Sequence, residues 1–271
     1  MHRPRATAGR LPAVALWAID LDGVMWRGSE PLPGAADAVR RLLERGDEVV
    51  FCTNHAMSPA SKVDRLRAMG VPDCPVITSA DAVVSACADA GSVLVLGDAT
   101  LVGYLRELGL PITDVRDLPD GAPVGEVDAV VVGALDDWNR SRIGMAADAV
   151  RAGARFLATN DDPTFPVTGP AGPRLLPGNG SLVAAVSTAG GRDAVVTGKP
   201  HRPMADVIVE RHGPVDVVVG DKPETDGGLA VALGARFGLV LTGVTAPEHL
   251  PVRPEPWAVG DDLAALVALD A

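Results

Sequence analysis

Two carboxylates stand at the end of the first strongly apolar segment of the chain. Residues 14–19 form a strand-like run, and Asp20 and Asp22 follow it, with a glycine directly after the second. Side chains at the carboxyl end of a buried strand reach the sheet edge where open α/β proteins bind ligands. Two such close carboxylates repel each other unless a cation compensates them, and oxygen-only ligands suit Mg²⁺. The pair predicts a divalent cation and an anionic substrate, although an Asp-Gly sequence alone is also typical of a turn.

Thr53 and Asn54 follow directly on a second apolar run, residues 48–52. A hydroxyl, an amide and exposed main-chain N–H groups at that position could receive phosphate oxygens, but the same residue types also form helix N-caps and turns. Lys199, within a Gly-Lys-Pro sequence, is one of three lysines in a chain whose usual cation is arginine. Lysine binds phosphate as a point charge, so we interpret it as a phosphate ligand, with a solvated surface lysine as the alternative.

A second acidic pair completes the series. Asp221 follows the apolar run 215–219 much as Asp20 follows the first one, and Asp226 lies near the start of the next predicted helix. We expect Asp221 to be a direct metal ligand and Asp226 to support the metal from behind or through water. Helix capping by Thr225 or Asp226 is the structural alternative.

The segments between these residues alternate between strand and helix patterns, which predicts an α/β fold with a buried parallel sheet. We expect strands at 14–19, 48–52, 76–78, 93–96, 129–132, 155–158, 195–196, 215–219 and 237–241. We expect helices at 35–44, 58–69, 100–108, 142–152, 182–188, 204–211, 228–234 and 261–269, and a loop or hairpin at 159–180. The pattern restarts twice, so we predict a Rossmann-like core of residues 1–79 and 194–271 and an inserted α/β domain of residues 80–193.

The composition narrows the class of protein. The 271 residues are 47% apolar but only 3% aromatic, so Val, Leu and Ala must form the core, and the net charge of −11 argues against binding to nucleic acid or anionic membranes. No apolar run approaches the ~18 residues of a membrane helix. Cys52, Cys74 and Cys87 lack ligand spacing, which predicts reduced thiols in a cytoplasmic protein. Residues 1–10 are basic, and we expect a tail there because the following apolar run continues into Asp20 without a signal-peptide cleavage site.

The chain resembles the haloacid dehalogenase superfamily of phosphohydrolases in the order of these motifs: a carboxylate pair, a Thr-Asn, a lysine and a second acidic pair. The chain is most similar to the branch with a large inserted α/β cap (type IIA), which includes nitrophenylphosphatases and phosphoglycolate phosphatases. The resemblance extends over residues 16–269, and within the insert it rests on residues 130–136, 158–166 and 177–181.

The resemblance implies a role for each of these residues. Asp20 would attack phosphorus and form an aspartyl-phosphate, and Asp22 would protonate the leaving oxygen and then activate water. Thr53, Asn54 and Lys199 would hold the phosphoryl oxygens. The metal, Mg²⁺, would be held by Asp20, the main-chain carbonyl of Asp22 and Asp221, with Asp226 in support.

The insert is expected to provide substrate selectivity. By the resemblance, Asn160, Asp161 and Asp162 would reach the leaving group, and Trp138 and Arg140 are weaker candidates; ordinary loop polarity or packing is the alternative for all of them. His55 stands where a second asparagine is common after Thr-Asn, so it either touches the leaving group or is a neutral loop residue.

Two further positions depart from the family pattern. Lys222 replaces a frequent arginine, and two glycines at 227–228 replace apolar residues. These departures leave the substrate preference open.

We therefore predict an Mg²⁺-dependent phosphatase whose partner is a small phosphorylated metabolite. Phosphoglycolate, glycerol phosphate, sugar phosphates and nucleoside monophosphates all stay open, and a homodimer is compatible with the resemblance but is not specified by the sequence. A receiver-type signalling domain fits poorly, because it is less than half this length and carries its phospho-acceptor on a later strand. A phosphomutase and a catalytically silent phosphate-binding protein on the same fold both stay open as competing hypotheses.

Overall fold

The computed structural model describes residues 11–12, 14–135, 137–169 and 172–270. They divide into two compact units, each described here by itself. The first unit contains the chain up to residue 53, residues 59–77 and the chain from residue 199 onward, and the second contains residues 54–58 and 78–198. The basic tail expected at residues 1–10 lies outside the described residues.

The first unit is built on a six-stranded sheet in the order β15-β14-β13-β1-β4-β5. β1 (Leu16–Ile19) is central and pairs in parallel with β13 (Val217–Gly220) and with β4 (Glu48–Thr53). The remaining strands are β5 (Val76–Thr78), β14 (Arg236–Val240) and β15 (Ala258–Gly260). Every residue of β1 and β13 is buried, as expected for parallel strands covered on both faces.

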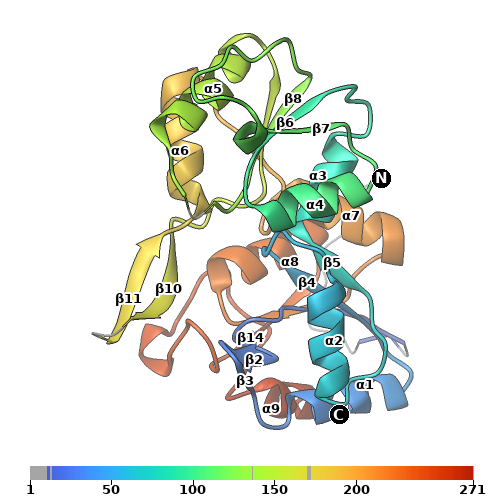
Figure 1. Cartoon of the computed structure of the whole chain (residues 1–271). Helices are drawn as coiled ribbons and strands as arrows, with labels where there is room; N and C mark the ends of the chain where they lie inside the picture. The colour runs from blue at the N-terminus through green and yellow to red at the C-terminus, as the bar shows by residue number, and fades with distance from the viewer. Residues whose placement is uncertain (1–10, 13, 136, 170–171, 271) are drawn as a thin grey trace. The chain divides into compact units, whose positions relative to one another are not determined.

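Helices cover this sheet (Figure 1). Apolar residues of α1 (Ala35–Glu44), α2 (Ala60–Ala68) and α9 (Leu263–Ala268) join one cluster with the β1 residues Trp17 and Ile19. α8 (Gly228–Leu233) contacts β13 and β14, and α7 (Arg202–His212) packs beside α8. A short antiparallel pair, β2 (Trp26–Arg27) and β3 (Glu30–Pro31), follows β1.

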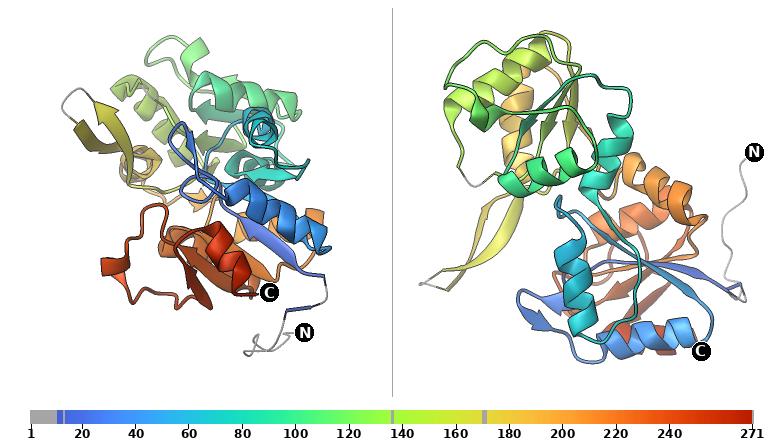
Figure 2. Two further views of the ribbon diagram at one scale, coloured as in Figure 1. Left: turned by 90° about the horizontal axis from the view of Figure 1, so that it is seen from below. Right: turned by 45° about the vertical axis from the view of Figure 1, so that its right-hand side comes forward.

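The second unit contains a five-stranded parallel sheet in the order β12-β9-β8-β6-β7. Its strands are β6 (Val93–Leu96), β7 (Ile112–Asp114), β8 (Ala129–Val132), β9 (Arg155–Ala158) and β12 (Val195–Val196). α5 (Arg140–Arg151) and α6 (Asn179–Gly190) pack on one face, and α3 (Ser79–Ala86) and α4 (Ala99–Glu107) on the other. The hairpin of β10 (Thr164–Gly169) and β11 (Gly172–Pro177) extends away from this sheet (Figure 2).

The observed fold confirms the predicted fold class, and several predicted segments, such as 35–44 and 129–132, match α1 and β8 at both ends. The predicted domain limits need correction. β12 pairs with β9, so residues that the prediction assigned to the outer domain complete the sheet of the second unit. Residues 54–58 also group with that unit.

Two simpler predictions can be compared directly with the structure. All three cysteines are free thiols, with Cys52 and Cys87 buried. Within the part of the chain that the structure describes, none of the helices has the length and apolar character needed to cross a membrane.

Candidate active site

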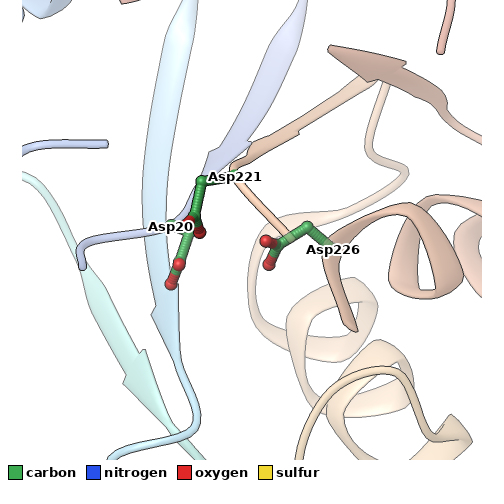
Figure 3. A group of neighbouring side chains, drawn as sticks. All are labelled: Asp20, Asp221 and Asp226. Carbon is green, nitrogen blue, oxygen red and sulfur yellow. The ribbon is translucent and has the colours of Figure 1, made fainter. Parts of the chain in front are cut away.

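The sheet register of the first unit brings two of the predicted carboxylates together. Ile19 of β1 aligns with Val219 of β13, and the N–H of Asp20 donates to the carbonyl of Val219 at 2.9 Å. Asp20 and Asp221 therefore leave neighbouring parallel strands at the same edge, although the paired residues of these strands are 200 positions apart in the sequence. Figure 3 shows their side chains close together at this edge, with Asp226 facing them.

Asp20, Asp221 and Asp226 form a compact buried cluster. One carboxylate oxygen of each lies within 4.8 Å of the other two. Asp226 is wholly buried in a π-helical turn (Pro223–Gly227), and its Oδ2 accepts the main-chain N–H of Lys222 at 3.1 Å. Asp226 thus lies in the cluster itself, and its expected role in support of the metal stays a prediction.

Lys199 is the cation of this cluster. Its Nζ lies 2.7 Å from Oδ1 of Asp20 and 2.7 Å from Oδ1 of Asp226, and it donates to the carbonyl of Cys52 at 3.3 Å. The side chain is 3% exposed, which rules out the alternative of a solvated surface lysine.

The electrostatics of the cluster are unbalanced toward negative charge. Burial raises the pKa of Asp20 well above its usual value, against the opposing effect of Lys199, and burial next to Asp226 raises the pKa of Asp221 to about 6. Burial alone would lower the pKa of Lys199, but Asp20 and Asp226 outweigh it and raise that pKa well above the usual value. Three carboxylates face one ammonium group, and hard oxygen ligands of this kind suit a divalent cation. The residues present therefore fit a metal ion.

Two glycines allow the chain to approach Asp221 closely. Gly23 has a φ of +82°, and a Cβ there would lie 2.5 Å from Oδ2 of Asp221; at Gly243 it would lie 1.8 Å from the same atom. The main-chain N–H of Val244 donates to this oxygen, and the hydroxyl of Thr242 donates to the carbonyl of Gly23. The loop after Asp20 and the loop after β14 thus pack around Asp221, and both depend on glycine.

Asp22 differs from the other carboxylates of the series. Its side chain is exposed, and its Oδ1 accepts the indole N–H of Trp26 at 2.8 Å. The structure therefore separates the two carboxylates of the first pair: the side chain of Asp20 belongs to the buried cluster, whereas that of Asp22 is held by the short β2 segment.

Thr53 and Asn54 fall in different units. Thr53 ends β4, next to β1, and is 4% exposed. Asn54 belongs to the second unit, where its amide donates to Oδ2 of Asp162 at 3.4 Å. A Cβ on Gly198 would lie 2.5 Å from Oδ1 of Asn54, so the residue before Lys199 must be glycine for Asn54 to pack there.

Among the selectivity candidates, Asn160 and Asp162 lie beside Asn54. The amide of Asn160 donates to the main-chain carbonyl of Asn54 at 3.1 Å, and the Ser79 hydroxyl donates to the same carbonyl at 2.9 Å. Asn160 is held in turn by Asn179, whose buried amide donates to the Asn160 carbonyl at 2.7 Å. Asn179 was not among the predicted site residues, although it lies in the family-like stretch 177–181.

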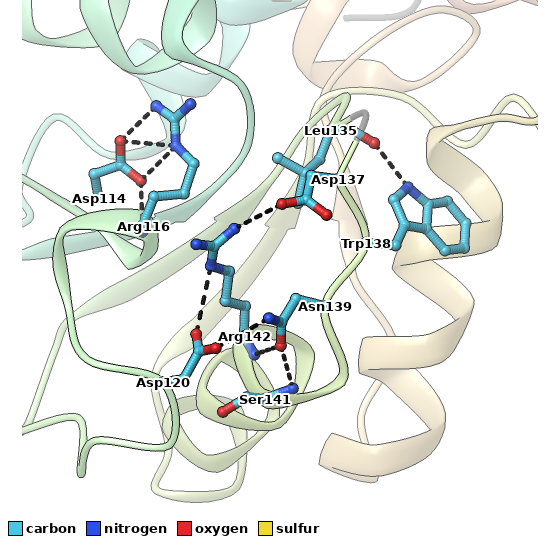
Figure 4. Close-up of polar contacts among 9 residues, drawn as sticks. All are labelled: Asp114, Arg116, Asp120, Leu135, Asp137, Trp138, Asn139, Ser141 and Arg142. Atoms are coloured by element: carbon cyan, nitrogen blue, oxygen red, sulfur yellow. Dashed lines mark hydrogen bonds and ion pairs between the residues drawn. The ribbon is translucent and has the colours of Figure 1, made fainter.

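The remaining selectivity candidates lie on exposed loops or near the start of α5. Asp161 and His55 are exposed, and the carbonyl of His55 accepts the N–H of Met57 at 2.9 Å. The Trp138 indole donates to the carbonyl of Leu135 at 2.7 Å, just before the Asn139 cap of α5, as Figure 4 shows; Arg140 is the first residue of that helix.

Comparison with known families and proteins gives a consistent result. The family model described as haloacid dehalogenase-like hydrolase matches residues 17–111, and a second, HAD-hydrolase-like model matches residues 196–266. The chain is 35% identical to the D-glycerol 3-phosphate phosphatase of Mycobacterium tuberculosis, over 92% of this chain and 69% of that protein. It is 33% identical to chronophin of Bos taurus, over 90% and 86% of the two chains.

Solved structures agree with these sequence relatives. The p-nitrophenyl phosphatase from Archaeoglobus fulgidus superposes with a TM-score of 0.82 at 29% identity, covering 95% of this chain and all of that one. The glycerol phosphate phosphatase of Mycobacterium tuberculosis in complex with magnesium superposes with a TM-score of 0.76 at 34% identity, covering 93% of this chain and 75% of that one.

Proposed function

Since this chain belongs to the haloacid dehalogenase-like hydrolases and is a phosphoric monoester hydrolase, we propose that it hydrolyses small phosphomonoesters through an aspartyl-phosphate formed on Asp20, with Mg²⁺ as its cofactor. The observation that carries this proposal is the buried cluster in which Lys199 lies 2.7 Å from both Asp20 and Asp226, with Asp221 beside them.

The nucleophile must be ionised to attack phosphorus. Burial opposes ionisation of Asp20 by raising its pKa, while the adjacent ammonium group of Lys199 lowers that pKa and favours the carboxylate. Lys199 would therefore favour the ionised form of Asp20 against the effect of burial, and it would supply positive charge close to the site of the transferred phosphoryl group.

The reaction then proceeds in two steps. An oxygen of Asp20 bonds to phosphorus while the ester P–O bond breaks, and Asp22 gives a proton to the leaving oxygen. Asp22 then takes a proton from water as that water attacks the phosphorus of the aspartyl-phosphate, which frees phosphate and restores Asp20. Two steps through a carboxylate are each easier than direct attack by water.

The other residues of the site would bind the phosphoryl group and the metal ion and hold them in position. Thr53, Asn54 and Lys199 would hold the phosphoryl oxygens. Asp20, Asp221 and the main-chain carbonyl of Asp22 would hold Mg²⁺, with Asp226 in support. When bound, the ion neutralises charge on Asp20 and on the phosphoryl oxygens, so that two anions can approach each other.

Selectivity is a further part of the proposal. Asp161, Asp162 and His55 are exposed or half-buried polar groups of the second unit and would contact the alcohol part of the ester. Three of the relatives are named for glycerol phosphate, sugar phosphates and nucleotides, which supports small esters as the substrate class.

The test is phosphate release from a panel of small esters, measured with Mg²⁺ and with EDTA. The panel includes phosphoglycolate, glycerol 3-phosphate, a sugar phosphate, a nucleoside monophosphate and p-nitrophenyl phosphate. Asp20→Asn should abolish turnover while the fold is retained. Asp216→Asn is the matched control, since Asp216 accepts the N–H of Leu16 at the opposite end of β1. Acid quenching during turnover should trap phosphate on the native chain and not on Asp20→Asn.

Two results would overturn the proposal. One is turnover in EDTA equal to turnover with Mg²⁺. The other is activity on every ester retained in Asp20→Asn. Transfer of phosphate to a second sugar hydroxyl in place of water would identify a phosphomutase instead.

A further inference from the structure

The segment that carries Asp22 is a tightly hydrogen-bonded loop. The carbonyl of Leu21 accepts the N–H of Met25 at 2.8 Å, and the N–H of Gly23 donates to the carbonyl of Trp26 at 2.7 Å. Asp22 and Trp26 also form an isolated β-bridge. The main chain therefore fixes these two residues side by side before any side-chain contact is considered.

The indole of Trp26 makes a directed contact with the carboxylate of Asp22. Its Nε1 lies 2.8 Å from Oδ1 of Asp22, and the Trp26 side chain is wholly buried although Asp22 is exposed. Trp17 offers a comparison, because its indole N–H is also buried but has no hydrogen-bond partner among the described residues. Burial of tryptophan in this chain does not by itself lead to such a contact.

The ring of Trp26 is held in turn by helix α2. The guanidinium carbon of Arg65 lies 4.1 Å from the ring centroid, and the Lys62 ammonium nitrogen lies 5.9 Å from it. Arg65 also donates to the carbonyl of Gly28 at 2.8 Å, in the turn between β2 and β3. A stacked cation and a main-chain hydrogen bond thus restrain both the ring and the loop that bears it.

We infer that Trp26 is a positioning residue for proton transfer by Asp22. An indole N–H can only donate, so it binds the unprotonated oxygen, Oδ1, and leaves the proton to Oδ2. In the first step this proton moves to the leaving oxygen as the ester P–O bond breaks; in the second, Oδ2 accepts a proton from water. The inference rests on the proposed function, in which Asp22 is the general acid and base.

The dependence on the leaving group tests this role. An alkoxide leaving from glycerol 3-phosphate needs a proton, whereas 4-nitrophenolate is a stable anion near neutral pH and does not. Positioned general acids contribute about 100-fold to 10,000-fold. We expect Trp26→Phe to lower kcat/KM for glycerol 3-phosphate by about tenfold or more, and that for p-nitrophenyl phosphate by less than about threefold.

The comparison needs two reference variants. Asp22→Asn should show the same selectivity to a larger extent, because it removes the proton donor itself. Trp17→Phe should change kcat/KM for the two esters by the same small factor, because it removes a buried indole N–H that has no hydrogen-bond partner among the described residues. If Trp26→Phe does not fold, 3-benzothienylalanine at position 26 keeps the shape of the side chain and removes only the N–H.

The outcomes separate the inference from the proposed function. Selective loss in both Trp26→Phe and Asp22→Asn supports the inference. Equal effects on the two esters in folded Trp26→Phe, with selective loss in Asp22→Asn, overturn the inference and leave the proposed function intact. No selectivity in Asp22→Asn removes the acid role of Asp22, and the inference with it.

Discussion

The amino group of Lys199 lies 2.7 Å from a carboxylate oxygen of Asp20, although the two residues are 179 positions apart in the chain. The pair is buried, so neither charge is stabilised by water, and each depends on the other. Asp226 shares the same ammonium group at the same distance. We therefore expect two roles for Lys199: it would stabilise the buried carboxylates, and it would favour the ionised form of the proposed nucleophile Asp20.

Removing this cation should affect stability and activity together. Lys199→Met leaves the buried carboxylates without their partner, and breaking a buried ion pair costs about 3–5 kcal/mol. We expect a loss of about this size in the free energy of unfolding, measured by urea at pH 8 in EDTA. We expect kcat to fall at least about 100-fold, as for the loss of one preorganised charge.

Lys199→Arg is the control for charge. Arginine restores the positive charge, but its guanidinium group is larger and planar, unlike the compact ammonium group of lysine. Relative to Lys199→Met, this variant should recover part of the stability and little of the activity. A Lys199→Met protein as stable as the native chain would show that the carboxylates do not need the lysine.

The metal-free protein should become more stable when Asp221 loses its charge. The folded state raises the pKa of Asp221 from 3.8 to about 6, first through burial and then through Asp226. A raised carboxyl pKa contributes stability below the unfolded value of 3.8, and this is lost as the pH rises through about 6. The loss amounts to roughly 3 kcal/mol at 1.36 kcal/mol per pKa unit.

We therefore expect Asp221→Asn to raise the unfolding temperature in EDTA at pH 8, with a smaller gain at pH 5. The same variant should lose the stabilisation that Mg²⁺ gives the native chain. Asp216→Asn, at the other end of the sheet, should retain the response to Mg²⁺. A destabilised Asp221→Asn protein in EDTA at pH 8 would contradict this account.

The sequence predicted well those elements whose pattern is local. β1, β8 and β13 are continuous apolar runs because both faces of a parallel strand are buried, and the polar residues that end β1 and β13 marked the site. α3 was missed because residues 79–83 are all buried and include Ser79 and Asp81, so the polar residues of this segment do not indicate a solvent-exposed helix face. β7 and β15 are only three residues long, so they can be identified as strands only by their pairing with neighbouring strands.

The finer structure of the site could not be read from the sequence. The buried position of Asp226 requires Gly220, where a Cβ would lie 2.0 Å from its Cγ, and this is a packing relationship across a turn. The hydrogen-bond partners of Trp26 and Asn179 likewise depend on the tertiary structure. From the sequence alone, either side chain could have been a core residue with no role in the site. The residue types predicted the chemistry of the site, whereas the contacts between its side chains depend on the fold.

Asn160 allows a test between selectivity and positioning. Its amide donates to the carbonyl of Asn54, and one such hydrogen bond contributes about 1 kcal/mol. If Asn160 positions Asn54, Asn160→Ala should lower kcat/KM by about fivefold on every ester and leave the order of substrates unchanged. A changed order of substrates would show contact with the leaving group instead. Asn139→Ala, at the cap of α5, is the matched control and should leave kcat/KM nearly unchanged.

Gly23 should be required for metal binding and not only for the shape of its turn. A side chain at a φ of +82° costs about 1–2 kcal/mol, and its Cβ would lie 2.5 Å from Oδ2 of Asp221. Gly46 has a φ of +91° in the same unit, and a Cβ added there would meet no described atom within 4 Å, so Gly46→Ala has the backbone cost alone. We expect Gly23→Ala to lose more unfolding free energy than Gly46→Ala, because it adds the close contact with Asp221 to the backbone cost. Only Gly23→Ala should weaken Mg²⁺ binding, by at least about tenfold in titration calorimetry, because Asp221 must move. Equal Mg²⁺ affinities in the two variants would mean that Asp221 does not hold the metal in this geometry.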